Sequence, residues 1–168
     1  MVRLSNTTSV LVIDDDELTR KALQKLLERR GYDLDVARSG KEGIEKAIEK
    51  HHNVALIDIV LPDMSGTDLL RKLKEIDPMM ANIMVTGKAT VDNAVEALNL
   101  GADAFIRKPF KPDELLITVE DKAAKQMITS ELTQEKISGF IQGMIKELVV
   151  ELSSIERDKR SRNLKDFV

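Results

Sequence analysis

The segment VLVIDDD, residues 10–16, joins a run of four aliphatic residues to three consecutive aspartates. The apolar run lacks the alternation of a strand with one face in water, and it is typical of a strand buried on both faces of a parallel sheet. A second run of this kind, Val54–Ile57, also ends in an aspartate, Asp58. These two strands therefore predict an α/β fold with carboxylates at the ends of its strands.

Apolar runs alternate with helical patterns along the first 125 residues. Helices are favoured where apolar residues recur every three or four positions and where the pattern stops at a glycine, as at Gly31 and Gly101. The alternation predicts a five-stranded, doubly wound parallel sheet of the flavodoxin-like kind, in which ligands lie beyond the carboxyl ends of the strands. The expected strands are 10–13, 33–37, 54–57, 82–85 and 104–107, and the expected helices are 18–30, 40–50, 66–76, 90–100 and 113–125.

Composition narrows the classes of function that this chain of 168 residues can have. The absence of cysteine excludes disulfides and thiolate metal sites, and it favours a cytoplasmic location. A net charge of −3 and only five aromatic residues make non-specific binding to nucleic acid unfavourable. The first apolar run stops at the aspartates, so it fits neither a signal peptide nor a membrane span.

The residues from 126 onward contain no strand pattern and form a different part of the chain. We expect a domain at 1–125 and a helical extension at 126–168, with the last ten or so residues disordered. One apolar stripe runs along the extension, and an exposed stripe of this kind favours aggregation unless another apolar surface packs against it. It predicts a homodimer, although a docking surface for a partner or the start of a further domain is also consistent with it. The stripe contains Ile137, Ile141, Met144, Leu148 and Leu152.

The aspartates that end the two buried strands predict a magnesium site. Asp14, Asp15 and Asp58 meet if their strands are neighbours, and carboxylates this close need a hard cation between them. A solvated turn is the simpler alternative, and Asp16 suits the N-cap of the following helix. Thr86 follows the fourth strand at the same edge.

The order of these motifs resembles the receiver domain of two-component response regulators. The resemblance covers about residues 8–125 and rests on VLVIDDDE, ALIDIVLPDMSG, IMVTG and FIRKPF, each at a strand end. It implies that Asp58 accepts a phosphoryl group from a histidine kinase or a phosphotransfer protein. It further implies that Asp14, Asp15, Asp58 and the backbone carbonyl of Val60 bind Mg²⁺, and that Thr86 and Lys108 contact the aspartyl phosphate.

The same resemblance implies a switch and an output face. Phe105 corresponds to the aromatic residue that moves inward when Thr86 engages the phosphate. Residues 90–98 are similar to receivers of nitrogen-regulator-type transcriptional activators, so this chain could also be the receiver part of such an activator. Val60 and Lys88 occupy the two positions that set the lifetime of the phosphate. No helix-turn-helix follows the receiver, so we do not expect the chain to bind DNA directly.

An enzymatic alternative is a phosphatase of the haloacid-dehalogenase type. Its motif, Asp-x-Asp-x-Thr, would need threonine where this chain has Leu18, and Thr19 comes one place too late. We therefore expect a phosphorylation-controlled signalling module and not an enzyme that acts on a metabolite. Both histidines, His51 and His52, lie between a helix and a strand, where we expect them on the surface.

Overall fold

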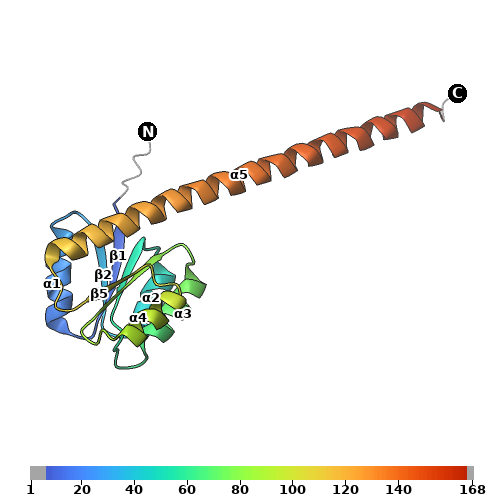
Figure 1. The fold of residues 1–168 in the computed structure, drawn as a ribbon. Helices are drawn as coiled ribbons and strands as arrows, with labels where there is room; N and C mark the ends of the chain where they lie inside the picture. Colours follow the sequence, from blue (N-terminus) through green and yellow to red (C-terminus); the bar gives the residue numbers. More distant parts are fainter. Residues whose placement is uncertain (1–6, 166–168) are drawn as a thin grey trace. The chain divides into compact units, whose positions relative to one another are not determined.

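The computed structural model describes residues 7–165 and, within them, the side chains of residues 7–162. Five strands alternate with five helices (Figure 1). The strands are β1 (Ser9–Ile13), β2 (Asp33–Ala37), β3 (Val54–Ile57), β4 (Ala81–Thr86) and β5 (Ala104–Arg107). The helices are α1 (Glu17–Glu28), α2 (Gly40–Glu49), α3 (Gly66–Ile76), α4 (Val91–Asn99) and α5 (Pro112–Lys165).

The strands form one parallel sheet in the order β2-β1-β3-β4-β5. This order confirms the predicted doubly wound α/β architecture. The chain reverses its direction of winding between β1 and β3, which are neighbours, and this is the place where open α/β sheets bind ligands. In the register of these two strands Ile13 lies beside Ile57, so the residues that follow them lie at the same edge of the sheet.

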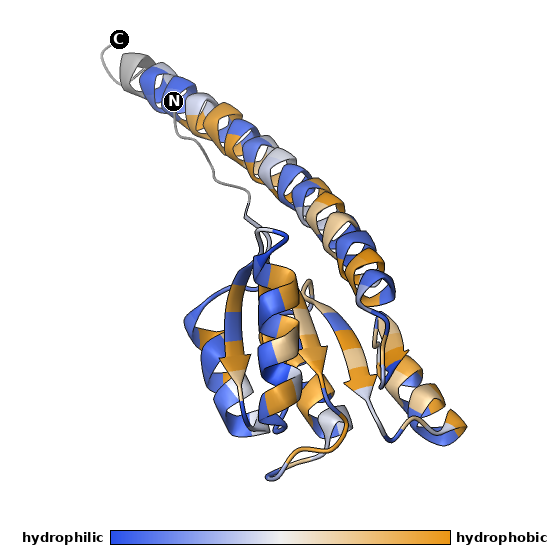
Figure 2. Ribbon diagram, turned by 90° about the vertical axis from the view of Figure 1, so that its left-hand side faces the viewer, coloured by the Kyte–Doolittle hydropathy of each residue, from blue (hydrophilic) through white to orange (hydrophobic). Residues whose placement is uncertain are grey.

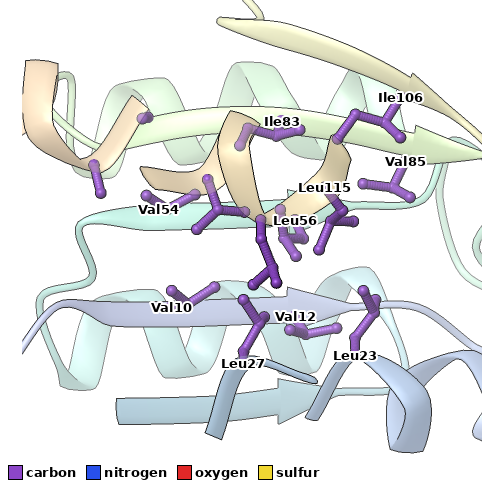
Figure 3. Close-up of a cluster of buried hydrophobic side chains, with 14 residues drawn as sticks. Val10, Val12, Leu23, Leu27, Val54, Leu56, Ile83, Val85, Ile106 and Leu115 are labelled. Atoms are coloured by element: carbon purple, nitrogen blue, oxygen red, sulfur yellow. The ribbon is translucent and has the colours of Figure 1, made fainter. Parts of the chain in front are cut away.

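Each face of the sheet packs against its own helices. Because side chains alternate along a strand, Val10 and Val12 face one side of β1 while Leu11 and Ile13 face the other. Figure 3 shows the first side, where β-strand residues meet Leu23 and Leu27 of α1 and residues of α5. The helices α2, α3 and α4 cover the second side. Figure 2 shows hydrophobic residues along the strands, and both hydrophobic and hydrophilic residues along the helices.

The local signals for helix ends are confirmed. Asp16 caps α1 by accepting a hydrogen bond from the N–H of Thr19, and Thr90 caps α4 in the same way. Gly31 and Gly101 follow the ends of α1 and α4 with φ angles of 83° and 90°, a conformation that other residues adopt at a cost.

Helix α5 differs most from the sequence prediction. It runs from Pro112 to Lys165 without a break, which confirms the predicted helical extension. The sequence analysis expected a separate helix ending at residue 125 and disorder over about the last ten residues, whereas the helix continues through both places as far as residue 165. Arg, Lys and Glu dominate residues 156–160, and these are good helix formers, which accounts for the continued helix. Residues 166–168 lie outside the described residues. The chain divides into two compact units, residues 1–128 and 129–168.

The prediction that both histidines lie on the surface is wrong for His52. Its side chain is buried, and its Nε2 atom lies 2.9 Å from Oδ2 of Asp35 in β2. His51 is exposed and contacts Asp77. The two neighbours differ because His52 lies two residues before the buried start of β3 and its ring faces Asp35 of β2. No helix in residues 7–165 is long and apolar enough to cross a membrane.

Candidate functional site

Three carboxylates gather at the carboxyl ends of β1 and β3. Asp14 and Asp15 follow β1, and Asp58 follows β3, where its N–H donates to the carbonyl of Ile13 at 3.0 Å. One carboxylate oxygen from each of the three lies within 4.8 Å of the others. Asp14 and Asp58 are buried, while Asp15 is exposed. The adjacency that the sequence analysis assumed for these strands is therefore present, and it brings the predicted ligands together.

Lys108 supplies a positive charge to this cluster. It follows β5, and the Lys108–Pro109 peptide bond is cis. Its Nζ atom donates to Oδ2 of Asp14 at 2.5 Å and to Oδ2 of Asp58 at 2.9 Å. Sequence reasoning placed Lys108 at the sheet edge, but it did not foresee that one ammonium joins both carboxylates.

Burial and charge act against each other in the cluster. Burial raises the pKa of Asp14 above its usual value, although hydrogen bonds from Lys108 and from the N–H of Asp16 act in the opposite direction. Burial alone would lower the pKa of Lys108, but its hydrogen bonds to Asp14 and Asp58 outweigh burial and raise that pKa. Lys108 is therefore a permanent cation at neutral pH.

The loop after β3 fixes the position of Asp58. The N–H of Val60 donates to Oδ1 of Asp58 at 3.1 Å, so both carboxylate oxygens are held. The loop closes where the N–H of Gly66 donates to the carbonyl of Ile59 at 2.6 Å. A Cβ atom at residue 66 would lie 2.2 Å from the backbone oxygen of Asp58, so only glycine fits there.

Asp63 is a second anchor of this loop, and sequence reasoning missed it. Its two carboxylate oxygens accept hydrogen bonds from the N–H groups of Gly40 and Lys41, both at 2.8 Å, at the start of α2. These bonds lower the pKa of Asp63. The segment Leu61–Gly66 reads as an ordinary turn, and no local signal shows that its aspartate reaches another helix.

A pocket of about 320 Å³ opens at this edge of the sheet. It brings together most of the predicted site residues. The buried Thr86 ends β4, and its hydroxyl accepts a hydrogen bond from the N–H of Lys88 at 3.1 Å. Phe105 does not line the pocket; it is partly buried against the core beside Met84. The lining residues are Asp15, Asp16, Thr19, Asp58, Val60, Thr86, Gly87, Lys88 and Lys108.

The carboxylate oxygens at this edge of the sheet suit a hard divalent cation, although Asp14 is not among the residues that line the pocket. Carboxylate oxygens are the ligands that Mg²⁺ prefers, and Mg²⁺ keeps several waters when one or two carboxylates bind it. Asp14, Asp15 and Asp58 offer such oxygens within reach of one ion. Asp16 is engaged in capping α1, so it does not belong to the set.

Comparison with known proteins decides the family. The model of the family described as "Response regulator receiver domain" matches residues 10–120. The chain belongs to this family. Receivers of this kind are signalling modules of two-component systems, and the match leaves the phosphatase interpretation without support.

Solved receivers share the fold and much of the sequence. A receiver domain from Methanospirillum hungatei is 41% identical, with a TM-score of 0.71 over 73% of this chain and 98% of that one. A response regulator from Burkholderia pseudomallei is 30% identical, with a TM-score of 0.65 over 74% of each chain, and its structure contains a phosphorylated aspartic acid and a calcium ion.

Among sequence relatives are proteins named as transcriptional regulators. ResD of Bacillus subtilis is 34% identical over 116 residues, which cover 69% of this chain and 48% of ResD. SrrA of Staphylococcus aureus is 35% identical over 114 residues, which cover 68% of this chain and 47% of SrrA. The chain thus spans about half the length of these relatives.

Gly66→Ala is expected to destabilise the receiver, because the added methyl group collides with the backbone of Asp58. Forced overpacking of this kind costs roughly 1–3 kcal/mol, measurable as a lower midpoint of urea unfolding. Gly87→Ala is the matched control, since its Cβ would meet no atom closer than 4.0 Å. Equal stability of the two variants would contradict the proposed role of Gly66.

Proposed function

We propose that Asp58 accepts a phosphoryl group from a phosphohistidine on a histidine kinase or a phosphotransfer protein, and that the receiver then changes its output face. The observation that supports this proposal is the cluster of Asp14, Asp15 and Asp58 with Lys108. Asp58 lies at the end of β3 beside two further carboxylates, with an ammonium in contact. Charged groups gathered in this way, two of the carboxylates being buried, are typical of functional sites and not of solvated turns.

The chemistry balances without a further reactant. An oxygen of the Asp58 carboxylate attacks the phosphorus atom, and an acyl phosphate forms. The bond between phosphorus and the donor's imidazole nitrogen breaks, and its electron pair returns to the imidazole, which takes up a proton. The hydrogen bonds from Val60 and Lys108 hold the carboxylate in one orientation for this attack.

We assign the magnesium ligands to Asp14, Asp15, Asp58 and the backbone carbonyl of Val60. A bound Mg²⁺ would neutralise the negative charge that gathers when a phosphoryl group approaches these carboxylates. Lys108 contacts both Asp14 and Asp58, so it supplies a second positive charge from the chain itself. The carboxylate set, rich in oxygen and poor in nitrogen and sulfur, favours Mg²⁺ over softer metals.

Thr86 and Lys108 are proposed to hold the phosphorylated state. A hydroxyl both accepts and donates, so Thr86 can donate to a phosphoryl oxygen while it accepts from Lys88. Engagement of Thr86 would move the end of β4, and Phe105 of β5 is paired with Met84, two residues before Thr86. We therefore propose that Phe105 transmits the change to the face formed by α4, β5 and the start of α5.

Asp58→Asn should abolish phosphorylation, because an amide oxygen is a far poorer nucleophile than a carboxylate. Incubation of the wild-type chain with Mg²⁺ and acetyl phosphate should raise its mass by one phosphoryl group. Asp92→Asn, in the first turn of α4, is the control and should be phosphorylated as the wild type. A phosphoryl adduct on Asp58→Asn, or turnover of a phosphate ester without any adduct, would refute the assignment.

Val60→Asn should shorten the lifetime of the phosphate. The side chain of Val60 lines the pocket and is 42% exposed, but it has no group that orients a water molecule. An amide there could position the attacking water, and one hydrogen bond made in the transition state gives about a tenfold faster loss. Val60→Leu should leave the rate of loss unchanged. Equal rates in the Asn and Leu variants would count against this explanation.

The extension at 126–168 is proposed to form a homodimer. Its predicted stripe residues are 45–61% exposed, and such a stripe on a monomer favours aggregation. The domain boundary at residue 125 and the cytoplasmic location remain predictions. The named relatives are transcriptional regulators. Over its described residues the extension is one continuous helix and contains no helix-turn-helix.

Leu148→Glu should convert the dimer into a monomer, because two charges would be buried in the apolar contact. Val150→Glu is the matched control: Val150 is similarly exposed, at 61% against 57%, but lies on the opposite side of the helix. Light scattering on the full chains should give the dimer mass for the wild type and for Val150→Glu. A monomeric wild type would overturn the proposal.

A further inference from the structure

The extension carries a regular seam that continues past its apolar part. Within the second compact unit, positions on one side of α5 follow one another at alternating steps of four and three residues, which is the pattern of helices that pair side by side. The first four positions are apolar, and three of the last four are charged. In order, the seam contains Ile137, Ile141, Met144, Leu148, Glu151, Ile155, Asp158 and Arg162.

A parallel pair of these helices would place like charges against each other. In a parallel, in-register pair each seam residue faces its own counterpart. Glu151 would then face Glu151, Asp158 would face Asp158, and Arg162 would face Arg162. Like charges placed opposite each other in a contact are strongly unfavourable. The charged part of the seam therefore disfavours the parallel orientation.

We propose that the extension pairs with a second copy of this chain in the antiparallel orientation. This inference rests on the proposed homodimer and adds its geometry. In the register that pairs the whole seam, from residue 130 to residue 162, with itself, Ile137 of one copy lies opposite Ile155 of the other, and Met144 lies opposite Leu148. Each pair occurs twice because a two-fold axis relates the copies.

The same register removes every like-charge contact from the seam. The seam also continues toward the start of the extension, because Ser130 and Gln134 precede Ile137 at the same steps of four and three residues. Arg162 then faces Ser130, and Asp158 faces Gln134, which can donate a hydrogen bond to it. Glu151 lies over Ile141 instead of over another glutamate.

Opposite charges also meet along the edge of the seam. Glu131 and Lys159 both lie one position beyond a seam residue on the same side, and the antiparallel register brings them to nearly the same height. The two ends of the extension also carry opposite net charges. Residues 129–136 contain two glutamates and one lysine, whereas residues 156–165 contain five basic and two acidic residues.

Disulfide trapping tests the orientation directly, because the chain has no cysteine of its own. Ile137→Cys and Ile155→Cys are made in separate full-length chains, one of which carries an affinity tag. After mixing and mild oxidation, the antiparallel pair should give a disulfide between the two different chains and little dimer from either chain alone. Val150→Cys, on the far side of the helix, is the control and should stay reduced.

Other outcomes would overturn the proposal. Efficient homodisulfides of Ile137→Cys alone and of Ile155→Cys alone would show a parallel pair. A monomeric chain without disulfides would overturn the orientation together with the dimer. Neither result would affect the assignment of Asp58 as the phosphoryl acceptor, because phosphorylation is measured in a separate experiment.

A charge exchange provides an independent test. Lys159→Glu should weaken the dimer, because it places a glutamate beside Glu131 of the other copy. Adding Glu131→Lys to the same chain should restore the affinity. The contact between residues 131 and 159 occurs twice in the dimer, so Lys159→Glu should raise the dissociation constant roughly three- to tenfold. Absence of rescue by the second substitution would contradict the antiparallel register.

Discussion

The gathering of Asp14, Asp15 and Asp58 at one partly buried edge of the sheet is the constraint on which the rest of the site depends. Two of these carboxylates are buried, and their oxygens lie within 4.8 Å of one another. Negative charge gathered and buried in this way is stabilised by a cation nearby. In this structure Lys108 takes that role by bonding to both Asp14 and Asp58. The same electrostatic need explains why the site suits a divalent cation and an incoming phosphoryl group.

The order of the strands creates this crowding. Because β1 and β3 are neighbours, the residues after Ile13 and after Ile57 have to share one edge of the sheet. The loop that follows β3 then has little freedom, since Gly66 closes against Ile59 and Asp63 bonds to the start of α2. The fold thus fixes Asp58 from both sides, and stability and reactivity depend on the same loop.

The parts of this account that depend on local sequence were predictable, and those that depend on distant contacts were not. The apolar runs predicted β3 and β5 with their correct ends, and Asp16 marked the start of α1. The double contact of Lys108 and the reach of Asp63 join segments far apart in the chain, so no local pattern reveals them. His52 was misplaced because its burial depends on the neighbouring strand. The length of α5 was missed because the pattern changes at residue 126 while the helix does not end.

The location of the phosphoryl group within the chain tests the central claim most directly. Sodium borohydride reduces an acyl phosphate to an alcohol, so it converts a phosphorylated aspartate into homoserine. The phosphorylated protein would be reduced in this way, digested and sequenced by mass spectrometry. Our account predicts homoserine at position 58 alone. Homoserine at position 14 or 15, or a phosphate that survives borohydride on another type of residue, would contradict it.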